Sequence, residues 1–62
     1  MNRSRQREQL ETRLIEARRV YQRATALARS DPEAADEARR ARRQIDATQR
    51  ELARLKAQWG EQ

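Results

Sequence analysis

Apolar residues recur along this 62-residue chain at alternating steps of four and three, which is the spacing of a coiled-coil seam. One series occupies the first half of the chain and a second series occupies the other half. Thr48 is the only polar member of either series. This 3.5-residue repeat gives each half one apolar stripe, so the pattern predicts two long amphipathic helices, over about residues 4–29 and 32–59. The two series are Leu10, Leu14, Ala17, Tyr21, Ala24 and Ala28, and then Ala34, Ala38, Ala41, Ile45, Thr48, Leu52, Leu55 and Trp59.

The segment between the two series has the features of a helix start. Asp31 is a natural N-cap, and Pro32 is tolerated in the first helical turn because its missing N–H would have no partner there. A single continuous helix would instead bury Pro32 in the helix interior, at a cost of about 3 kcal/mol, and would break the heptad phase. The sequence therefore predicts one antiparallel hairpin over residues 1–62, with its turn at 30–31.

The hairpin predicts its own register. If the turn centres on Asp31, the numbers of facing residues add to about 62, so that Ala24 faces Ala38. The seam residues nearest the turn are alanines, which predicts that the helices approach most closely there and separate toward the termini. At the open end Trp59 would face Arg3, and we expect apolar surface there that lacks a partner within the chain.

Composition supports an all-α fold that self-associates. Charged residues make up 40% of the chain, with one glycine and one proline, which suits helices better than sheets. A chain of this length buries too little surface to be more than marginally stable, and it has no cysteine to form a disulfide. We therefore expect a homodimer, in which two hairpins of the coiled-coil type form a four-helix bundle.

Several functional classes are disfavoured by what the chain lacks. Its longest run without a charge is five residues, 24–28, which predicts no membrane span, no signal peptide and a cytoplasmic location. Histidine and cysteine are both missing, which removes the usual metal ligands and nucleophile–base pairs. We therefore predict a non-enzyme with no catalytic residue, no metal, no cofactor and no small-molecule substrate.

The first functional prediction is a protein–protein interaction module, such as an adaptor, a co-chaperone or a regulatory subunit. The apolar stripe is wider than a two-position seam, because further aliphatic residues flank it. A second copy of the chain and a helix of another protein are both suitable occupants of that stripe. The residues predicted to form the interface are Leu10, Leu14, Ile15, Val20, Tyr21, Leu27, Ile45, Leu52, Leu55 and Trp59.

The alternative prediction is a regulator that binds nucleic acid, RNA in particular, through a central band of arginines. In the register above, Arg39 lies beside Arg23 and Arg43 lies beside Arg19. Positive charge at that density can bind phosphates with little dependence on base sequence. The band consists of Arg18, Arg19, Arg23, Arg39, Arg40, Arg42 and Arg43.

A simpler interpretation of these arginines is a solvated face. Five pairs have the spacings of ion pairs on a helix surface. They are Asp36–Arg39 and Glu16–Arg19, three residues apart, and Asp36–Arg40, Asp46–Arg42 and Asp46–Arg50, four residues apart. No aromatic residue is interleaved with the band to stack on bases.

The pattern resembles the Rop family of plasmid copy-number proteins. The resemblance lies in chain length, in the antiparallel heptad hairpin and in the acidic turn Ser30-Asp31-Pro32-Glu33-Ala34-Ala35-Asp36. It is a resemblance of architecture. It implies a dimeric four-helix bundle and a role in binding paired RNA loops, both of which we take as expectations.

Overall fold

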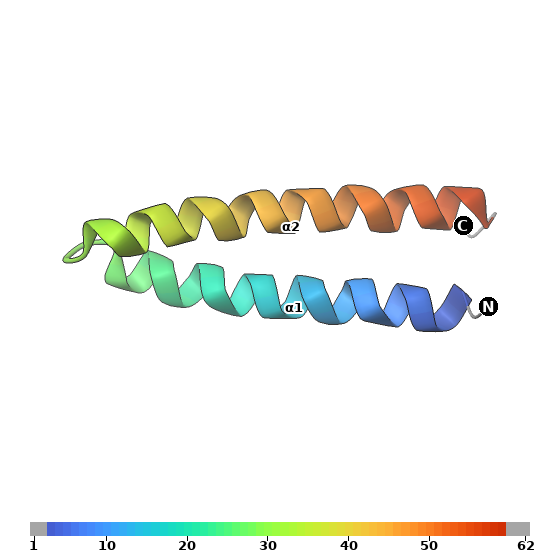
Figure 1. The fold of residues 1–62 in the computed structure, drawn as a ribbon, viewed down its shortest axis with the longest axis horizontal. Coiled ribbons are helices and arrows are strands. Elements are labelled where there is room, and N and C mark those ends of the chain that lie inside the picture. Colours follow the sequence, from blue (N-terminus) through green and yellow to red (C-terminus); the bar gives the residue numbers. More distant parts are fainter. Residues whose placement is uncertain (1–2, 60–62) are drawn as a thin grey trace.

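The computed structural model describes residues 3–59 as two helices joined by a short turn (Figure 1). Helix α1 spans Arg3–Leu27 and helix α2 spans Pro32–Gln58, and no strand occurs within these residues. The helices run antiparallel and pack against each other, so that both ends of the described chain lie at the same end of a rod measuring 45 × 16 × 16 Å. The predicted all-α helical hairpin is confirmed.

The turn begins earlier than the sequence pattern predicted. Helix α1 ends at Leu27, two residues before the expected end, and the Leu27 carbonyl accepts backbone bonds from Ser30 (3.1 Å) and Asp31 (3.0 Å). Asp31 has extended dihedral angles (φ −138°, ψ 107°), as expected for a residue that precedes proline. Residues 28–30 reverse the chain ahead of this extended residue, so they leave the helix.

Asp31 caps helix α2 as predicted. Its side-chain carboxylate accepts a hydrogen bond from the Glu33 N–H at 3.0 Å, and its carbonyl accepts one from the Ala34 N–H at 3.1 Å. Pro32 occupies the first turn of the helix. The cap therefore satisfies backbone donors that would otherwise lack an intrahelical partner.

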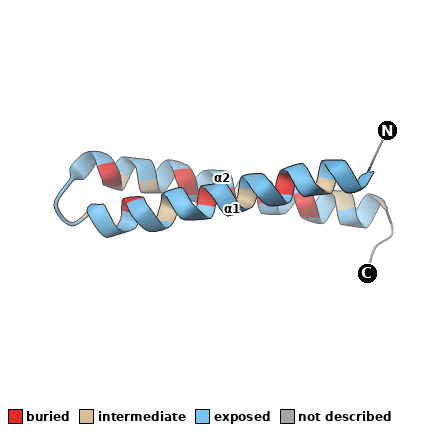
Figure 2. Ribbon diagram, turned by 90° about the horizontal axis from the view of Figure 1, so that it is seen from below, coloured by how far each residue is buried: buried red, intermediate tan, exposed pale blue. Residues whose placement is uncertain are grey.

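The heptad positions form the core of the hairpin. All fourteen are buried or half-buried, and the buried ones lie along the facing sides of the two helices (Figure 2). Ala24 is fully buried, and Thr48 is the one buried polar residue of the described chain. No buried side-chain nitrogen or oxygen between residues 3 and 59 lacks a hydrogen-bond partner.

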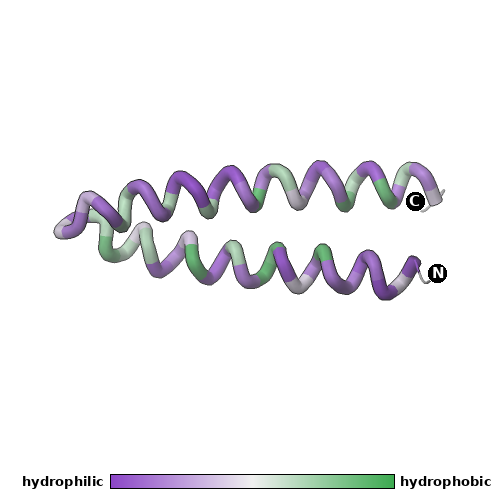
Figure 3. Tube along the Cα trace, viewed as in Figure 1, coloured by the Kyte–Doolittle hydropathy of each residue, from purple (hydrophilic) through white to green (hydrophobic). Residues whose placement is uncertain are grey.

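The two helices cross at an angle. Their ribbons overlap near the turn in Figure 1 and near the middle of the rod in Figure 2, which is turned by 90°. The seam residues nearest the turn are alanines, and leucines join the seam toward the termini. Apolar positions concentrate on the facing sides, while most of the remaining surface is hydrophilic (Figure 3). The hairpin exposes 5237 Å², against about 4,200 Å² for a compact globule of its mass.

Candidate interaction surface

Most of the predicted interface residues are used by the hairpin itself. The register pairs each seam residue with another from the same chain, so these side chains face inward. Leu10, Ile45 and Leu52 are buried. Leu14, Tyr21, Leu55 and Trp59 are half-buried. Three of the ten predicted residues are exposed: Ile15, Val20 and Leu27.

The open end of the rod is covered in part by a cationic side chain. The Arg3 guanidinium carbon lies 5.9 Å from the centre of the Trp59 ring, within the range of a cation–π contact. This contact matches the predicted register, in which Arg3 faces Trp59. It also means that the open end carries less free apolar surface than we expected.

Val20 and Leu27 lie on one side of the hairpin, together with polar residues from α2. They are seven residues apart on α1, which is about two helical turns, and they are 37% and 51% exposed. One shallow hollow on this side is lined by Leu27, Ala34 and Arg40 and by four acidic residues, Asp31, Glu33, Asp36 and Glu37. A second is lined by Val20, Glu37, Arg40 and Gln44, with Ala17 and Ala41 at its base. We call this surface, formed by Val20, Leu27, Glu37, Arg40 and Gln44, the Val20–Leu27 face.

Ile15 belongs to a different side of α1. It is as exposed as Leu27, at 51%. Five residues separate it from Val20, which corresponds to a rotation of about 140° around the helix. Ile15 is therefore a single exposed aliphatic side chain, separate from the Val20–Leu27 face.

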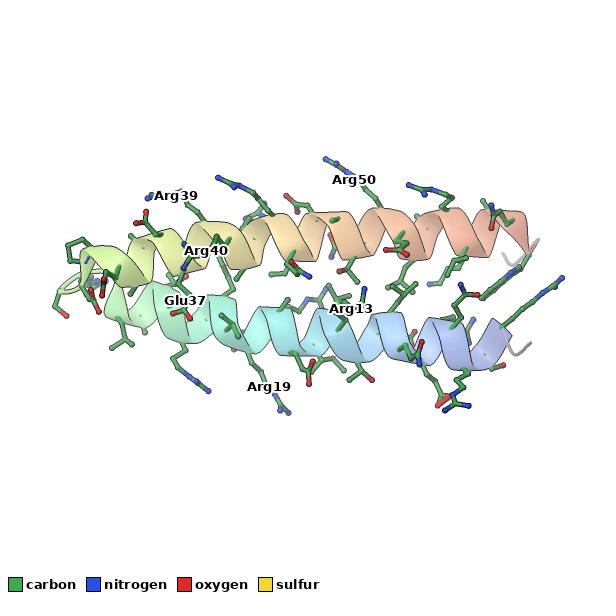
Figure 4. The ribbon with its side chains drawn as sticks, in the orientation of Figure 1. Arg13, Arg19, Glu37, Arg39, Arg40 and Arg50 are labelled. Atoms are coloured by element: carbon green, nitrogen blue, oxygen red, sulfur yellow. The ribbon has the colours of Figure 1, made fainter. Side chains whose placement is uncertain are left out.

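The seven arginines of the predicted band surround the rod and do not share one side of it. All seven are exposed. Arg39 points outward from α2 and Arg19 points outward from α1, in opposite directions (Figure 4). Arg43 follows Arg39 by four residues, so it lies on the same outer side of α2. Arg23 follows Arg19 by four residues and also lies three residues after Val20 and four before Leu27, so it is next to Arg19 and borders the Val20–Leu27 face.

The expected proximity of Arg39 to Arg23 and of Arg43 to Arg19 is therefore wrong. The register sets the level of a residue along the rod, but the rotation of each helix sets the side it faces. Arg39 and Arg19 point away from each other on opposite outer sides of the hairpin (Figure 4).

Two of the seven arginines have acidic partners on their own helix, at spacings that the sequence predicted. The other predicted pairs, Asp36–Arg40, Asp46–Arg50 and Glu16–Arg19, do not form within residues 3–59. Arg39 forms an ion pair with Asp36, and the Arg42 Nε lies 3.4 Å from the Asp46 carboxylate. The Tyr21 side chain, through a hydrogen bond, and the Asp46 carboxylate raise the pKa of Arg42 above its usual value. Within residues 3–59 the other five form no ion pair or side-chain hydrogen bond: Arg18, Arg19, Arg23, Arg40 and Arg43.

Sequence reasoning missed the α2 half of the Val20–Leu27 face. Glu37 and Gln44 were not predicted as interface residues, and Arg40 was assigned to phosphate binding. All three lie in the hollows beside Val20 and Leu27. The signal was present in the heptad, because Val20, Leu27, Glu37 and Gln44 all flank the seam at equivalent positions of their helices.

Two further kinds of site were sought in the described residues, a metal site and a membrane-spanning helix. Between residues 3 and 59, no group of three or more acidic side chains is arranged to hold a metal ion. Over the same span, neither helix combines the length and apolarity that crossing a bilayer requires.

The chain was compared with protein families, with curated proteins and with solved structures. No protein family, curated protein or solved structure matches this chain.

Proposed function

We propose that this chain is a non-enzymatic protein–protein interaction module, acting as an adaptor, a co-chaperone or a regulatory subunit, and that it binds a helical partner through the Val20–Leu27 face. The observation that carries the proposal is the exposure of two large aliphatic side chains on the same side of one helix, next to Glu37 and Arg40, which take part in no ion pair or side-chain hydrogen bond within residues 3–59.

The spacing of the two aliphatic residues suits an approaching helix. Residues seven apart lie about 10 Å from each other along the axis, so they contact successive turns of a partner that lies alongside. The alanines at the base of the hollow, Ala17 and Ala41, leave room for a partner side chain to enter.

Burial of this face supplies a moderate driving force. Complete burial of a valine or leucine is worth about 1.5–3 kcal/mol, and Val20 and Leu27 have only part of their surface left to bury. Both side chains project from the regular helix α1, so little conformational freedom is lost when they bind. Glu37 and Arg40 would fix the orientation of a partner through charge.

Site-specific photocrosslinking tests this proposal. A benzophenone amino acid placed at position 20 should capture a protein in the native host, and the same group placed at Ile15 should not, because Ile15 is equally accessible but lies on another side. Nuclease treatment before analysis removes material held through nucleic acid. Equal capture from positions 15 and 20 would contradict the proposal.

A second candidate function is phosphate binding by the arginines. It is favoured by the net charge of +5 and by the five arginines that have no acidic partner within the described residues. Fixed cations release condensed counterions from a nucleic acid, and this yields affinity without base recognition. The arginines face several directions, so a single duplex would contact only those on one side (Figure 4).

A further inference from the structure

We infer that the occupant of the Val20–Leu27 face is a second copy of this chain, which binds antiparallel about a two-fold axis at the level of Ala24 and Ala38. This inference rests on the proposed function, because it names the partner of the same face. It follows from the positions of two pairs of residues, the apolar pair Val20 and Leu27 on α1 and the charged pair Glu37 and Arg40 on α2.

The two pairs share one midpoint along the rod. The midpoint of Val20 and Leu27 falls at position 23.5, and the midpoint of Glu37 and Arg40 falls at 38.5. These positions add to 62, which is the register that the heptads predict and with which the contact between Arg3 and Trp59 agrees. Both pairs are therefore centred on the same level of the hairpin.

A two-fold axis through that level, lying across the rod, satisfies both pairs at once. It places Val20 against the partner's Leu27 and Leu27 against the partner's Val20. It also places Glu37 against the partner's Arg40, and Arg40 against the partner's Glu37. An isologous interface requires this kind of self-complementary arrangement.

The side chains on the face are oriented as this arrangement requires. Glu37 and Arg40 lie between the two helices near the turn, whereas Arg39 points away from them (Figure 4). Within residues 3–59, neither the Glu37 nor the Arg40 side chain takes part in an ion pair or a hydrogen bond. Ala24 is fully buried at the level of the axis, so it does not hold two copies apart.

The position of the axis determines the shape of the dimer. It lies nearer the turn than the open end, so the copies overlap only over about residues 16–46, a length of about 22 Å. The open ends project in opposite directions. The resulting assembly is about 65 Å long, compared with 45 Å for the hairpin.

This limited overlap predicts a weak dimer. A strip about 22 Å long on a rod 16 Å wide buries about 350 Å² on each copy, less than half of the roughly 800 Å² of a standard stable interface. Arg23 adds like charge at the edge of the interface near the axis, which further limits the affinity. Self-association should therefore be concentration-dependent and readily reversible.

A charge-reversal experiment tests the inference. Glu37→Arg alone creates Arg–Arg contacts across the axis, and Arg40→Glu alone creates Glu–Glu contacts. Each change should raise the dissociation constant of the homodimer at least about tenfold in sedimentation equilibrium, because two ion pairs become two repulsions. An equimolar mixture of the two variants should associate, because every contact across the axis is again between opposite charges.

Two control variants separate this effect from net charge. Glu51→Arg makes the same change outside the overlap, and Arg43→Glu makes it on the outer side of α2. Both should associate as the unmodified chain does, and circular dichroism should give the same helicity for all variants. The double variant E37R/R40E, which exchanges the two charges, should also recover self-association.

Three results would overturn the inference: a chain that stays monomeric at millimolar concentration, single reversals that associate normally, or a mixture that fails to associate. If the chain is monomeric but the crosslinker at position 20 captures another protein, the second copy is excluded and the proposed function stands. If neither association nor capture occurs, both fail.

Discussion

At the scale of single residues, Asp31 combines two roles that the chain reversal needs. Its extended backbone accommodates the following Pro32, and its carboxylate accepts the hydrogen bond from the Glu33 N–H at 3.0 Å. The acceptor oxygen, more than the charge, satisfies that donor, because Asn and Asp are comparable as N-caps.

Asp31→Ala should therefore lower the free energy of unfolding by about 1 kcal/mol, because the Glu33 N–H loses its side-chain acceptor. Asp31→Asn keeps an acceptor in the same place and should retain most of the stability. Urea unfolding followed by circular dichroism measures both. An equal loss of stability in the two variants would mean that the charge of Asp31 is what stabilises the hairpin, and it would contradict the capping role.

The side-chain types of Leu27 and Ile15 did not predict what surrounds each of them in the fold. Leu27 and Ile15 are large, aliphatic and equally exposed, and the sequence predicted both as interface residues. Their environments differ, because Leu27 lies beside Glu37 and Arg40 while Ile15 lies on another side of α1. That distinction required the packing of α2 against α1.

At the scale of the helices, the heptad pattern predicted most of the fold. It gave the number of helices, their antiparallel arrangement, the register and the buried seam. Helix α1 was predicted two residues too long, because alanine and arginine at positions 28–29 favour a helix and nothing local indicates that the reversal requires them. Tertiary geometry decided the end of the helix.

The arginine band was misjudged at the same scale. The four arginines of α2 occur within five consecutive positions, and each step along a helix rotates the side chain by about 100°. They therefore point in several directions, as Arg39 and Arg40 do in Figure 4. The register predicted how far along the rod each arginine lies. It did not predict the side of the rod that each arginine faces, and the single shared side was an assumption.

Leu52→Ala tests the packing of the seam. Leu52 is 8% exposed, and removing its buried methyl groups should cost about 2–5 kcal/mol. Ile15→Ala is the matched control: this side chain is 51% exposed, so the change should stay within about 0.5 kcal/mol. Urea unfolding measures both free-energy changes. A low protein concentration keeps self-association from contributing to them. Similar costs for the two variants would mean that the seam does not hold the helices together.

At the scale of the whole molecule, the rod leaves much of its surface in contact with water. The hairpin exposes about 1,000 Å² more than a compact globule of equal mass, because two helices can cover each other on one side only. Most positions away from the seam are hydrophilic (Figure 3). Under the proposed function, a partner would be selected by the few aliphatic positions that remain exposed and by the distribution of charge.

The phosphate-binding alternative has a salt signature set by the shape of the rod. A duplex on the outer side of α1 meets Arg19 and Arg23, which have no acidic partner within residues 3–59, and two phosphate contacts give a slope of about −1.8 for log K against log salt. Replacing both with glutamate should then abolish RNA binding, whereas the same changes at Arg43 and at Arg39, which pairs with Asp36, should have a smaller effect. If RNA does not bind at about 50 mM salt and micromolar protein, the arginines form a solvated surface.

The most direct test of the Val20–Leu27 face is the concentration dependence of the backbone amide chemical shifts, measured by NMR from about 20 micromolar to about 1 millimolar protein. The account predicts shifts that change at Val20, Leu27, Glu37, Arg40 and Gln44, while those at Ile15 and at the open end of the rod stay constant. Changes centred on Ile15 or on the open end would contradict it.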